Sequence, residues 1–342
     1  MADKETAKRS RRSSGAITLR DVAKLAGVAP ITASRALNTP DQVSGDMLKK
    51  VKEAVERTGY VPNRMAGGLA SARSRLVAAI VPSTVISVFN ETIESLNGTL
   101  FDAGYQLMLG QSGYSPAREE MLLEAVIGRR PDGIFITGIM PPGKARARLL
   151  ASGIPVVETW DLTPTPVDMV VGFSHAQIGH DVARFFMKKG RHNFAIVRAE
   201  DERADRRTRA FIEAVKGQGM GDVHVENVGA LRTLRSGRDA MAKILMAMPK
   251  VDAIFCSSDL LAMGVLTEAR ARHISVPDRL SVMGFGDVPF VADMIPALST
   301  VRINGAQIGL IAARCLMDRA EGRPVSQPIV DVGFSIIERD ST

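Results

Sequence analysis

Cysteine is scarce in this chain: only Cys256 and Cys315 occur among 342 residues, far apart and each in an apolar stretch. A disulfide framework and a cysteine-rich zinc module are therefore excluded. No apolar run approaches the roughly 18 residues that a transmembrane helix needs, and the charged amino terminus has no apolar signal core. We expect a cytoplasmic protein without a membrane partner, long enough to bury a core without metal or cofactor.

Motifs for catalysis are also missing. The segment GIMPPGKA (138–145) follows an apolar strand as a phosphate-binding loop does, but Ala145 lacks the hydroxyl that holds magnesium and two prolines remove backbone amides. His175 and His180 are five residues apart, the wrong spacing for one helical face to chelate a metal. No G-x-S-x-G elbow is present. We therefore predict no catalytic residues and no metal site.

Positive charge is concentrated at one end of the chain. Residues 1–75 contain 15 Lys and Arg against 7 Asp and Glu, whereas the remainder contains 29 against 30. Such asymmetry indicates a polyanion-binding head on a neutral body. The alternative, a solvated basic tail, fits residues 8–12 but not the positive residues that lie inside helical patterns further on.

Local signals predict three short helices in this head. The first begins at Thr18, a capping residue, and ends before Gly27, which permits a tight turn. The second covers 30–37 with a proline in its first turn, and the third ends at Gly59. Two short helices joined by a tight turn and closed by a third form a helix-turn-helix unit.

The segments TLRDVAKLAGVAPITASRALN (18–38) and GYVPNRMAGGLAS (59–71) resemble the DNA-binding head and hinge of lactose- and galactose-repressor-type transcription regulators, the LacI family. The resemblance implies a helix-turn-helix domain over 16–61 that binds double-stranded DNA at a near-palindromic operator, in a homodimer. A basic flexible tail (1–15) would precede it and a hinge (62–75) would follow.

Within the second helix, the resemblance implies that Pro30, Ile31 and Arg35 face base edges in the major groove. Arg35 can form two hydrogen bonds with a guanine, worth about 1–3 kcal/mol of discrimination; a phosphate contact is the alternative. In the hinge, Leu69 matches the residue that wedges between central base pairs; a plain linker is the alternative. The expected DNA-contacting residues are Thr18, Pro30, Ile31, Thr32, Ser34, Arg35, Asn38, Asn63, Arg64 and Leu69.

From residue 76 onward, buried strand patterns alternate with helical patterns. Strands are predicted at 76–82, 105–110, 132–137, 154–159, 195–199, 222–227, 252–257 and 280–285, and helices at 89–103, 118–129, 175–189 and 238–248. Such alternation requires parallel sheets covered on both faces, and the likeness of DGIFITG (132–138) to DAIFCSSD (252–259) indicates two similar lobes. The predicted fold class is an all-α head plus a two-lobed α/β body.

The family resemblance implies a body of the periplasmic-binding-protein type I, with crossovers near residues 172, 302 and 326. The N-terminal lobe would comprise 76–172 and 303–325, and the C-terminal lobe 173–302 and 326–342. In open parallel sheets, ligands bind beyond the carboxyl ends of the strands, which here face the cleft between the lobes.

The strand ends therefore supply candidates for ligand binding: Ser83, Phe89, Gln111, Tyr114, Glu158, Trp160, Asp161, Ser258, Asp259, Phe285 and Asp287. The resemblance adds Arg207, which lies where relatives place a ligand-binding arginine. Aromatic surfaces and hydrogen-bonding groups suit a small hydroxylated compound, and the arginine suits a carboxylate. The alternatives are a core aromatic for Trp160, surface or inter-lobe pairing for Glu158 and Asp161, a salt bridge from Arg207 to Glu202 or Asp205, and a helix N-cap for Asp259.

The body most closely resembles the gluconate-operon repressor branch, through QSGYSPAREE (111–120), PVVETWDLTPTPVDMVVGFSH (155–175), the arginine-rich turn at 201–207 and DVGFS (331–335). The resemblance implies gluconate or a close derivative as effector, with another sugar or keto-sugar acid as the alternative. Gly286 stands where relatives commonly carry an aspartate that grips sugar hydroxyls, and Ser258 where an asparagine is frequent. We therefore predict a transcriptional repressor controlled by a sugar acid, and not an enzyme; a sugar-binding protein is the less favoured reading, because the head is basic.

Overall fold

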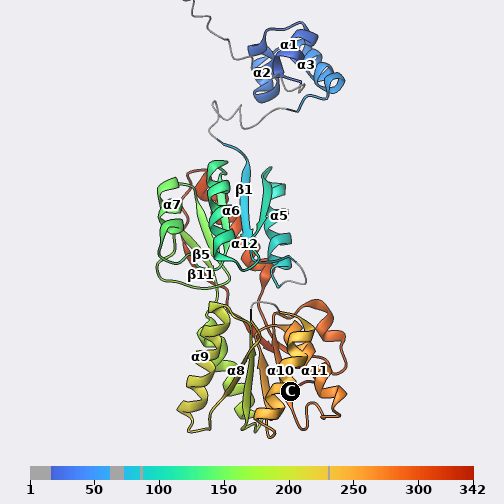
Figure 1. Ribbon diagram of the computed structural model, residues 1–342. Coiled ribbons are helices and arrows are strands. Elements are labelled where there is room, and N and C mark those ends of the chain that lie inside the picture. The colour runs from blue at the N-terminus through green and yellow to red at the C-terminus, as the bar shows by residue number, and fades with distance from the viewer. Residues whose placement is uncertain (1–16, 62–72, 85–87, 230–231) are drawn as a thin grey trace, which may run out of the picture. The chain divides into compact units, whose positions relative to one another are not determined.

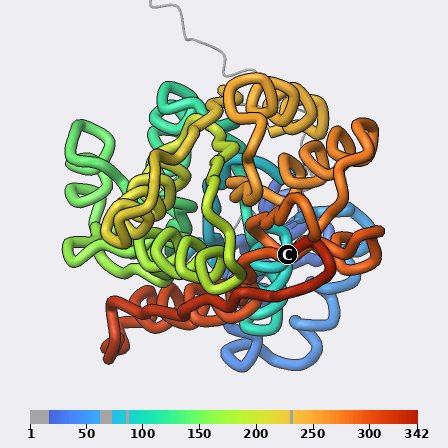
Figure 2. Tube along the Cα trace, turned by 90° about the horizontal axis from the view of Figure 1, so that it is seen from below, coloured from blue at the N-terminus to red at the C-terminus, as the bar shows by residue number. Residues whose placement is uncertain are grey.

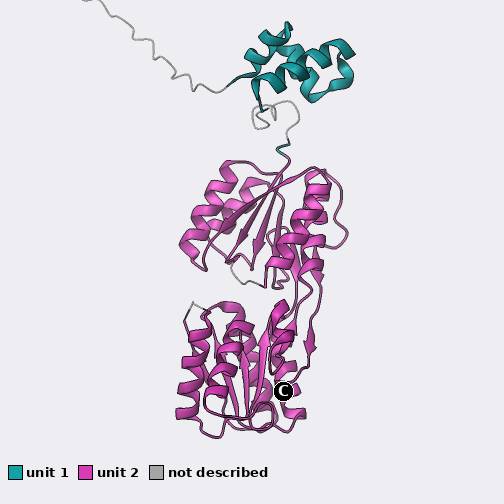
Figure 3. Cartoon of the chain, turned by 90° about the vertical axis from the view of Figure 1, so that its right-hand side faces the viewer, with its two compact units in different colours: residues 1–74 teal, residues 75–342 magenta. Residues whose placement is uncertain are grey.

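The computed structural model describes residues 17–61, 73–84, 88–229 and 232–342, and the chain divides into two units, residues 1–74 and 75–342 (Figure 3). No helix in these ranges is long and apolar enough to cross a membrane. The expected basic tail, most of the hinge and the candidates Asn63, Arg64 and Leu69 lie outside the described residues.

The first unit is a small helical domain. It contains α1 (Leu19–Ala26), α2 (Pro30–Asn38), the short 3-10 helix η1 (Pro40–Gln42) and α3 (Gly45–Thr58). Gly27 ends α1 in the left-handed conformation, with φ 66°, which is the turn that the sequence predicted. Its core consists of Val22, Ala23, Ala33, Ala36, Val51 and Ala54. The small alanines let three short helices approach closely, and the helix-turn-helix prediction is confirmed.

The first lobe of the second unit is built on a six-stranded parallel sheet with strand order β11-β5-β4-β3-β1-β2. The strands β3, β4 and β5 are buried along their whole length, as expected when helices cover both faces. The elements are β1 (Leu76–Val81), α5 (Asn90–Asp102), β2 (Gln106–Gln111), α6 (Pro116–Gly128), β3 (Gly133–Thr137), α7 (Lys144–Ser152), β4 (Val156–Thr159), β5 (Met169–Gly172), α12 (Gly305–Ala320) and β11 (Ile329–Asp331).

The second lobe repeats this plan with strand order β12-β10-β9-β8-β6-β7, in which only β12 is antiparallel to its neighbour among the described strands. The elements are α8 (His175–Lys188), β6 (Phe194–Arg198), α9 (Glu202–Gly217), β7 (His224–Asn227), α10 (Leu234–Ala247), β8 (Ala253–Cys256), α11 (Asp259–Ala271), β9 (Ser281–Phe285), η2 (Pro289–Asp293), β10 (Ser299–Arg302) and β12 (Ser335–Ile337). The two-lobed α/β body is thereby confirmed.

The chain passes between the lobes at 173–174, 303–304 and 332–334. The first two positions agree with the expected crossovers near 172 and 302. The third lies after residue 331, not near 326, because β11 pairs with β5 and still belongs to the first sheet. A half-exposed strand of three residues gives no buried apolar run from which its sheet could be assigned. Figure 2 lets this last stretch be followed, in dark red, to the carboxyl terminus.

Helix pairs cover the sheets: α5 packs with α12 and α6 with α7 in the first lobe, and α8 with α9 and α10 with α11 in the second (Figure 1). The helices α8 and α9 approach each other closely at Gly179, where a Cβ atom would lie 2.2 Å from the carbonyl oxygen of Arg207. Glycine is therefore required at this crossing. It holds the backbone of Arg207 directly against α8.

Candidate functional site

One face of α2 in the helical unit is open to solvent. Ile31 is 64% exposed, Pro30, Arg35 and Asn38 are also exposed, and Thr32 and Ser34 are half-buried. Within the described part of the chain, the Arg35 guanidinium has no ion pair or hydrogen bond, so that its donors are available to a nucleic acid. An isoleucine exposed to this extent beside a free arginine is the pattern expected of a base-reading face.

The positive side chains of this unit also point outward. Arg20, Lys24, Lys49, Lys50 and Lys52 are all exposed, and such residues neutralise phosphates in DNA complexes. At the start of α1, the backbone N–H and hydroxyl of Thr18 donate to the Asp21 carboxylate over 2.8 and 2.7 Å. Thr18 is therefore exposed but engaged in its own helix cap.

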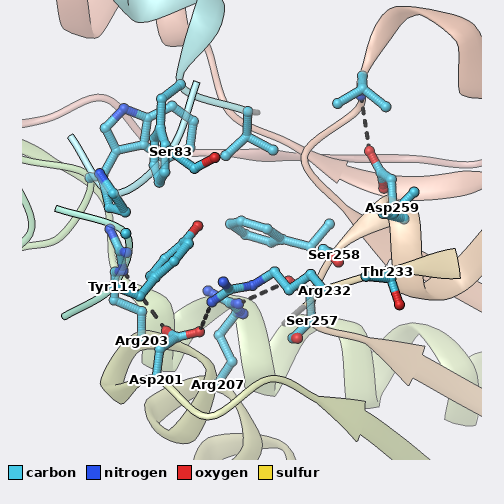
Figure 4. A pocket seen from close by; sticks show the side chains of 18 of the residues that line it. Ser83, Tyr114, Asp201, Arg203, Arg207, Arg232, Thr233, Ser257, Ser258 and Asp259 are labelled. Carbon is cyan, nitrogen blue, oxygen red and sulfur yellow. Dashed lines mark hydrogen bonds and ion pairs between the residues drawn. The ribbon is translucent and has the colours of Figure 1, made fainter. Parts of the chain in front are cut away.

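The second unit contains a cavity of about 490 Å³ between its two lobes, within the range of small-molecule sites, roughly 300–1,000 Å³. Its lining residues follow β1, β2 and β4 of the first lobe and β6, β8 and β9 of the second, and Figure 4 shows the cavity from close by. Most of the sequence-predicted ligand residues come together here: Ser83, Phe89, Gln111, Tyr114, Trp160, Arg207, Ser258, Asp259 and Phe285.

Trp160 forms part of the wall on the side of the first lobe. The side chain is 2% exposed, packs edge-on against Phe89 and Phe173 with ring centroids 4.9 and 5.7 Å apart, and donates its indole N–H to the Thr92 hydroxyl over 3.1 Å. Its backbone has φ 64°, an uncommon conformation for a bulky residue that the surrounding contacts must hold. Trp160 is thus a core aromatic and a lining residue together.

Arg207 is the buried cation of the cavity. Its Nη1 donates to His175 Nδ1 over 2.9 Å and its Nη2 to the Ser257 carbonyl oxygen over 3.3 Å. The guanidinium lies 4.0 Å from the centre of the Phe285 ring. Burial lowers its pKa to about 10, which leaves it charged at neutral pH. No described carboxylate forms an ion pair with it, so the salt bridge considered as an alternative is not formed.

The expected partners of that salt bridge are used elsewhere on α9. Glu202 accepts from Arg206 over 2.5 Å, and Asp205 pairs with Arg198 and Arg209 over 2.8 and 2.9 Å. The charge of Asp201 favours the ionised Arg207 from nearby, but a buried guanidinium without a carboxylate in direct contact remains costly unless another anion arrives.

His175 begins α8 and lines the same cavity, although the sequence did not place it among the ligand residues. Its Nε2 lies 2.9 Å from the Trp160 carbonyl oxygen, which can only accept, so Nε2 carries the proton. Nδ1 is then the acceptor for Arg207. Burial and then the neighbouring Arg207 lower the pKa of His175 well below its usual value, and the imidazole is neutral.

Two further arginines and an aspartate complete the polar end of the cavity (Figure 4). Arg203 lies 5.5 Å from the Phe89 ring, and Arg232 lies 4.2 Å from the Tyr114 ring and pairs with Asp201. Burial opposes ionisation of Asp201, but the three arginines outweigh it and lower its pKa. Arg203 could have been found from the sequence, because it lies four residues before Arg207 on one helical face.

Asp259 lies at the opposite end of the cavity. It accepts hydrogen bonds from the Thr300 hydroxyl over 2.6 Å and from the Val288 N–H over 2.9 Å. Burial raises its pKa to about 6. The N-cap of α11 is Ser258, whose hydroxyl accepts from the Leu261 N–H. The interpretation of Asp259 as a helix cap is therefore wrong.

Three expected ligand residues do not line this cavity. Glu158 is buried and accepts from the N–H groups of Met140 and Val167 over 2.6 and 2.7 Å. Asp161 pairs with Arg206 over 2.7 Å, which links the first lobe to α9 of the second. Asp287 pairs with Arg339 and Arg302 over 2.7 and 3.5 Å, outside the cavity. Each carboxylate is bound by these partners and does not face this cavity.

Gly286 has a conformational reason to lack a side chain. Its φ is 131°, and a Cβ atom there would lie 2.2 Å from Val88 Cγ1. The aspartate that the family resemblance led us to expect would have to adopt this strained backbone and displace the Val88 side chain.

Comparison with known proteins assigns both units. A model of the bacterial regulatory proteins of the lacI family matches residues 18–63, and a periplasmic binding protein-like domain matches residues 183–342. The HTH-type transcriptional regulator GntR of Pseudomonas aeruginosa is 35% identical over 333 residues, 97% of each chain.

Solved structures agree with this assignment. A LacI-family regulator from Silicibacter pomeroyi is 32% identical over 95% of this chain and 99% of its own, with a TM-score of 0.89. The lac repressor dimer bound to operator, 19% identical, shares the fold over 96% of this chain and 99% of its own, with a TM-score of 0.81. The relatives are transcription regulators and not enzymes. This chain belongs to the lacI family of DNA-binding transcriptional repressors.

Proposed function

We propose that the protein is a cytoplasmic repressor whose operator affinity is controlled by a sugar acid, gluconate or a close derivative, bound in the cavity between the lobes. The observation that carries the proposal is Arg207: a buried, charged guanidinium, held by neutral acceptors, with no carboxylate partner among the described residues. A ligand carboxylate can bind such a group through two hydrogen bonds.

The charges that line the cavity favour a ligand with a negative charge. Three arginines face two aspartates, Asp201 and Asp259, and Asp201 is already paired with Arg232. An anion therefore improves the charge balance, whereas a neutral sugar would leave Arg207 with only the nearby charge of Asp201 and no carboxylate hydrogen-bonded to it.

The rest of the lining suits a polyhydroxylated chain. Hydroxyl and amide groups of Ser83, Gln111, Thr233 and Ser258 border the cavity beside the aromatic rings. Carbon-bound hydrogens of a sugar acid pack on such rings, while its hydroxyls exchange hydrogen bonds with the polar groups. The resemblance to the gluconate-operon repressor branch points to the same class of ligand.

For the DNA side, we infer that α2 lies in the major groove with Arg35 and Ile31 toward the bases, with Leu69 as the wedge in the minor groove.

A near-palindromic operator requires a two-fold dimer. In its support, β2 is one of the two edge strands of the first sheet. It carries the exposed Leu109, and the neighbouring helices α5 and α6 carry Phe101 and Met121, exposed by 67% and 70%. A second copy covering this edge would bury these side chains.

Effector control follows from the position of the cavity. The ligand would contact both lobes, so it favours one lobe arrangement by its differential affinity. The aromatic residues Phe89, Trp160, Phe173 and Phe285 belong to a single apolar cluster that continues through both lobes. This cluster connects the lobes beside the cavity.

Calorimetric titration of the full-length protein tests the effector class. The ligands are gluconate, a gluconate phosphate, a keto-gluconate and the neutral polyol glucitol; we expect binding of at least one acid and none of glucitol. Arg207→Met should weaken acid binding about 10- to 100-fold. The control is Arg209→Met on the same helix, whose side chain is 64% exposed and which should change affinity less than about twofold.

Operator release tests the coupling. In a fluorescence anisotropy titration with operator DNA, the bound acid should shift the affinity of wild type and of Arg209→Met, but not that of Arg207→Met. Tight binding of glucitol, or equal responses from all three proteins, would remove the sugar acid from the mechanism.

A further inference from the structure

A continuous chain of hydrogen bonds joins the effector arginine to the opposite lobe. It runs from Arg207 on α9 to His175 at the start of α8, and from His175 to the Trp160 carbonyl oxygen after β4, with both distances 2.9 Å. The indole of Trp160 extends it to Thr92 on α5 over 3.1 Å. His175 is the element of this chain that contacts both lobes, because it accepts from one and donates to the other.

The helix α8 holds Arg207 at two points. Gly179 meets the backbone carbonyl of Arg207 at the helix crossing, where no side chain fits, and His175, four residues earlier on the same face, holds the guanidinium. The ring of His175 is itself fixed: it is 3% exposed and packs edge-on against Phe173 with centroids 4.8 Å apart. The acceptor Nδ1 can therefore occupy only one place.

We propose that His175 is a positioning residue for the effector: its Nδ1, fixed as an acceptor by the Trp160 carbonyl, orients the Arg207 guanidinium toward the ligand carboxylate and ties it to the first lobe. The expected effect of His175 on ligand binding rests on the proposed anionic effector. The orientation of Arg207 by His175 can be tested without any ligand.

The main charged groups around His175 oppose a proton on Nδ1. Arg207, Arg203 and Arg206 from α9 contribute positive charge, and His175 also lies at the positive end of α8. The hydrogen bond to the Trp160 carbonyl favours protonation, but burial and these arginines outweigh it. The acceptor state of Nδ1 is thus maintained at neutral pH, and with it the hydrogen bond from Arg207.

A double-mutant cycle measures the binding role. His175→Phe keeps an aromatic ring against Phe173 but neither accepts nor donates; it should weaken gluconate binding to the full-length protein about 10-fold or more. In the Arg207→Met background, the same substitution should change affinity less than about twofold, because the group that His175 orients is absent. His180→Phe, the same change on the same helix, is the matched control and should behave as wild type. Equal losses from His175→Phe in both backgrounds would show a merely structural role and overturn the proposal.

A ligand-free measurement decides the orientation itself. Imidazole nitrogen chemical shifts of the nitrogen-labelled full-length protein should show His175 as the neutral Nε2–H tautomer at neutral pH. Arg207→Met should displace the Nδ1 resonance and leave that of His180 unchanged. An Nδ1–H tautomer, a protonated ring, or an Nδ1 resonance indifferent to Arg207→Met would overturn the inference.

The binding cycle and the chemical-shift measurement together distinguish the effector proposal from the proposed role of His175. If the predicted tautomer and its response to Arg207→Met are found but no acid binds, the effector assignment fails while the orientation of Arg207 stands. If an acid binds and the cycle is additive, the effector assignment stands and His175 is removed from it.

Discussion

The close approach of α8 and α9 at Gly179 gives a prediction with a matched control in the same chain. A Cβ atom at residue 179 would lie 2.2 Å from the Arg207 carbonyl oxygen and 2.9 Å from both the Ala210 Cβ and the Phe211 nitrogen. Since Cβ atoms essentially never approach other atoms within 3.0 Å, Gly179→Ala must push the helices apart by roughly 1 Å in a close-packed interior.

Overpacking of this kind costs about 1–3 kcal/mol, and the contact with unyielding backbone atoms places Gly179→Ala at the upper end. The control is Gly98→Ala in α5, where a Cβ atom meets nothing within 4 Å. That substitution should stabilise the protein by about 0.5–1 kcal/mol, because alanine loses less backbone freedom than glycine in a helix. The two variants therefore move stability in opposite directions.

Thermal unfolding of the full-length protein is the assay. For a unit of this size each kcal/mol shifts Tm by roughly 2–4 °C, so Gly179→Ala should lower Tm by about 4–12 °C and Gly98→Ala should raise it slightly. The same displacement draws the Arg207 guanidinium away from His175, and acid binding should weaken with it. Unchanged stability of Gly179→Ala, or a shift in the same direction as Gly98→Ala, would contradict the packing argument.

Local sequence signals were enough to predict the fold of the helical unit, because its turn and helix caps are encoded within a few residues. Gly27 does adopt the left-handed turn, and Ala33 and Ala36 are buried while Ile31 and Arg35 are exposed. In the body, the strand ends located the cavity, since parallel strands bring their carboxyl ends to one edge.

The strand ends did not tell which carboxylates would face the cavity. Strand alternation would place Glu158 and Trp160, two residues apart, on the same face, but β4 ends at Thr159 and Trp160 has a left-handed backbone with φ 64°. Backbone N–H groups of the adjoining loops bind Glu158. The roles of Asp161 and His175 depend on contacts with the other lobe. Such pairings between distant segments leave no local pattern in one sequence.

Three further predictions test the cavity and the DNA-reading face. Because Asp259 has its pKa raised to about 6 when folded, its ionisation opposes folding: between about pH 4 and 6 stability should fall as pH rises, by up to about 3 kcal/mol, and urea unfolding of Asp259→Asn should lack this fall. Arg35→Ala should weaken specific operator binding by about 1–3 kcal/mol and leave non-specific binding nearly unchanged in a salt-matched anisotropy titration; equal losses would make Arg35 a phosphate contact. Trp160 is the only tryptophan of the chain and lines the cavity while its indole donates to Thr92, so its emission reports directly on the wall that a ligand touches. An effector that enters between the lobes must therefore change tryptophan fluorescence in proportion to calorimetric occupancy, and a saturating effector that leaves the emission unaltered binds somewhere else.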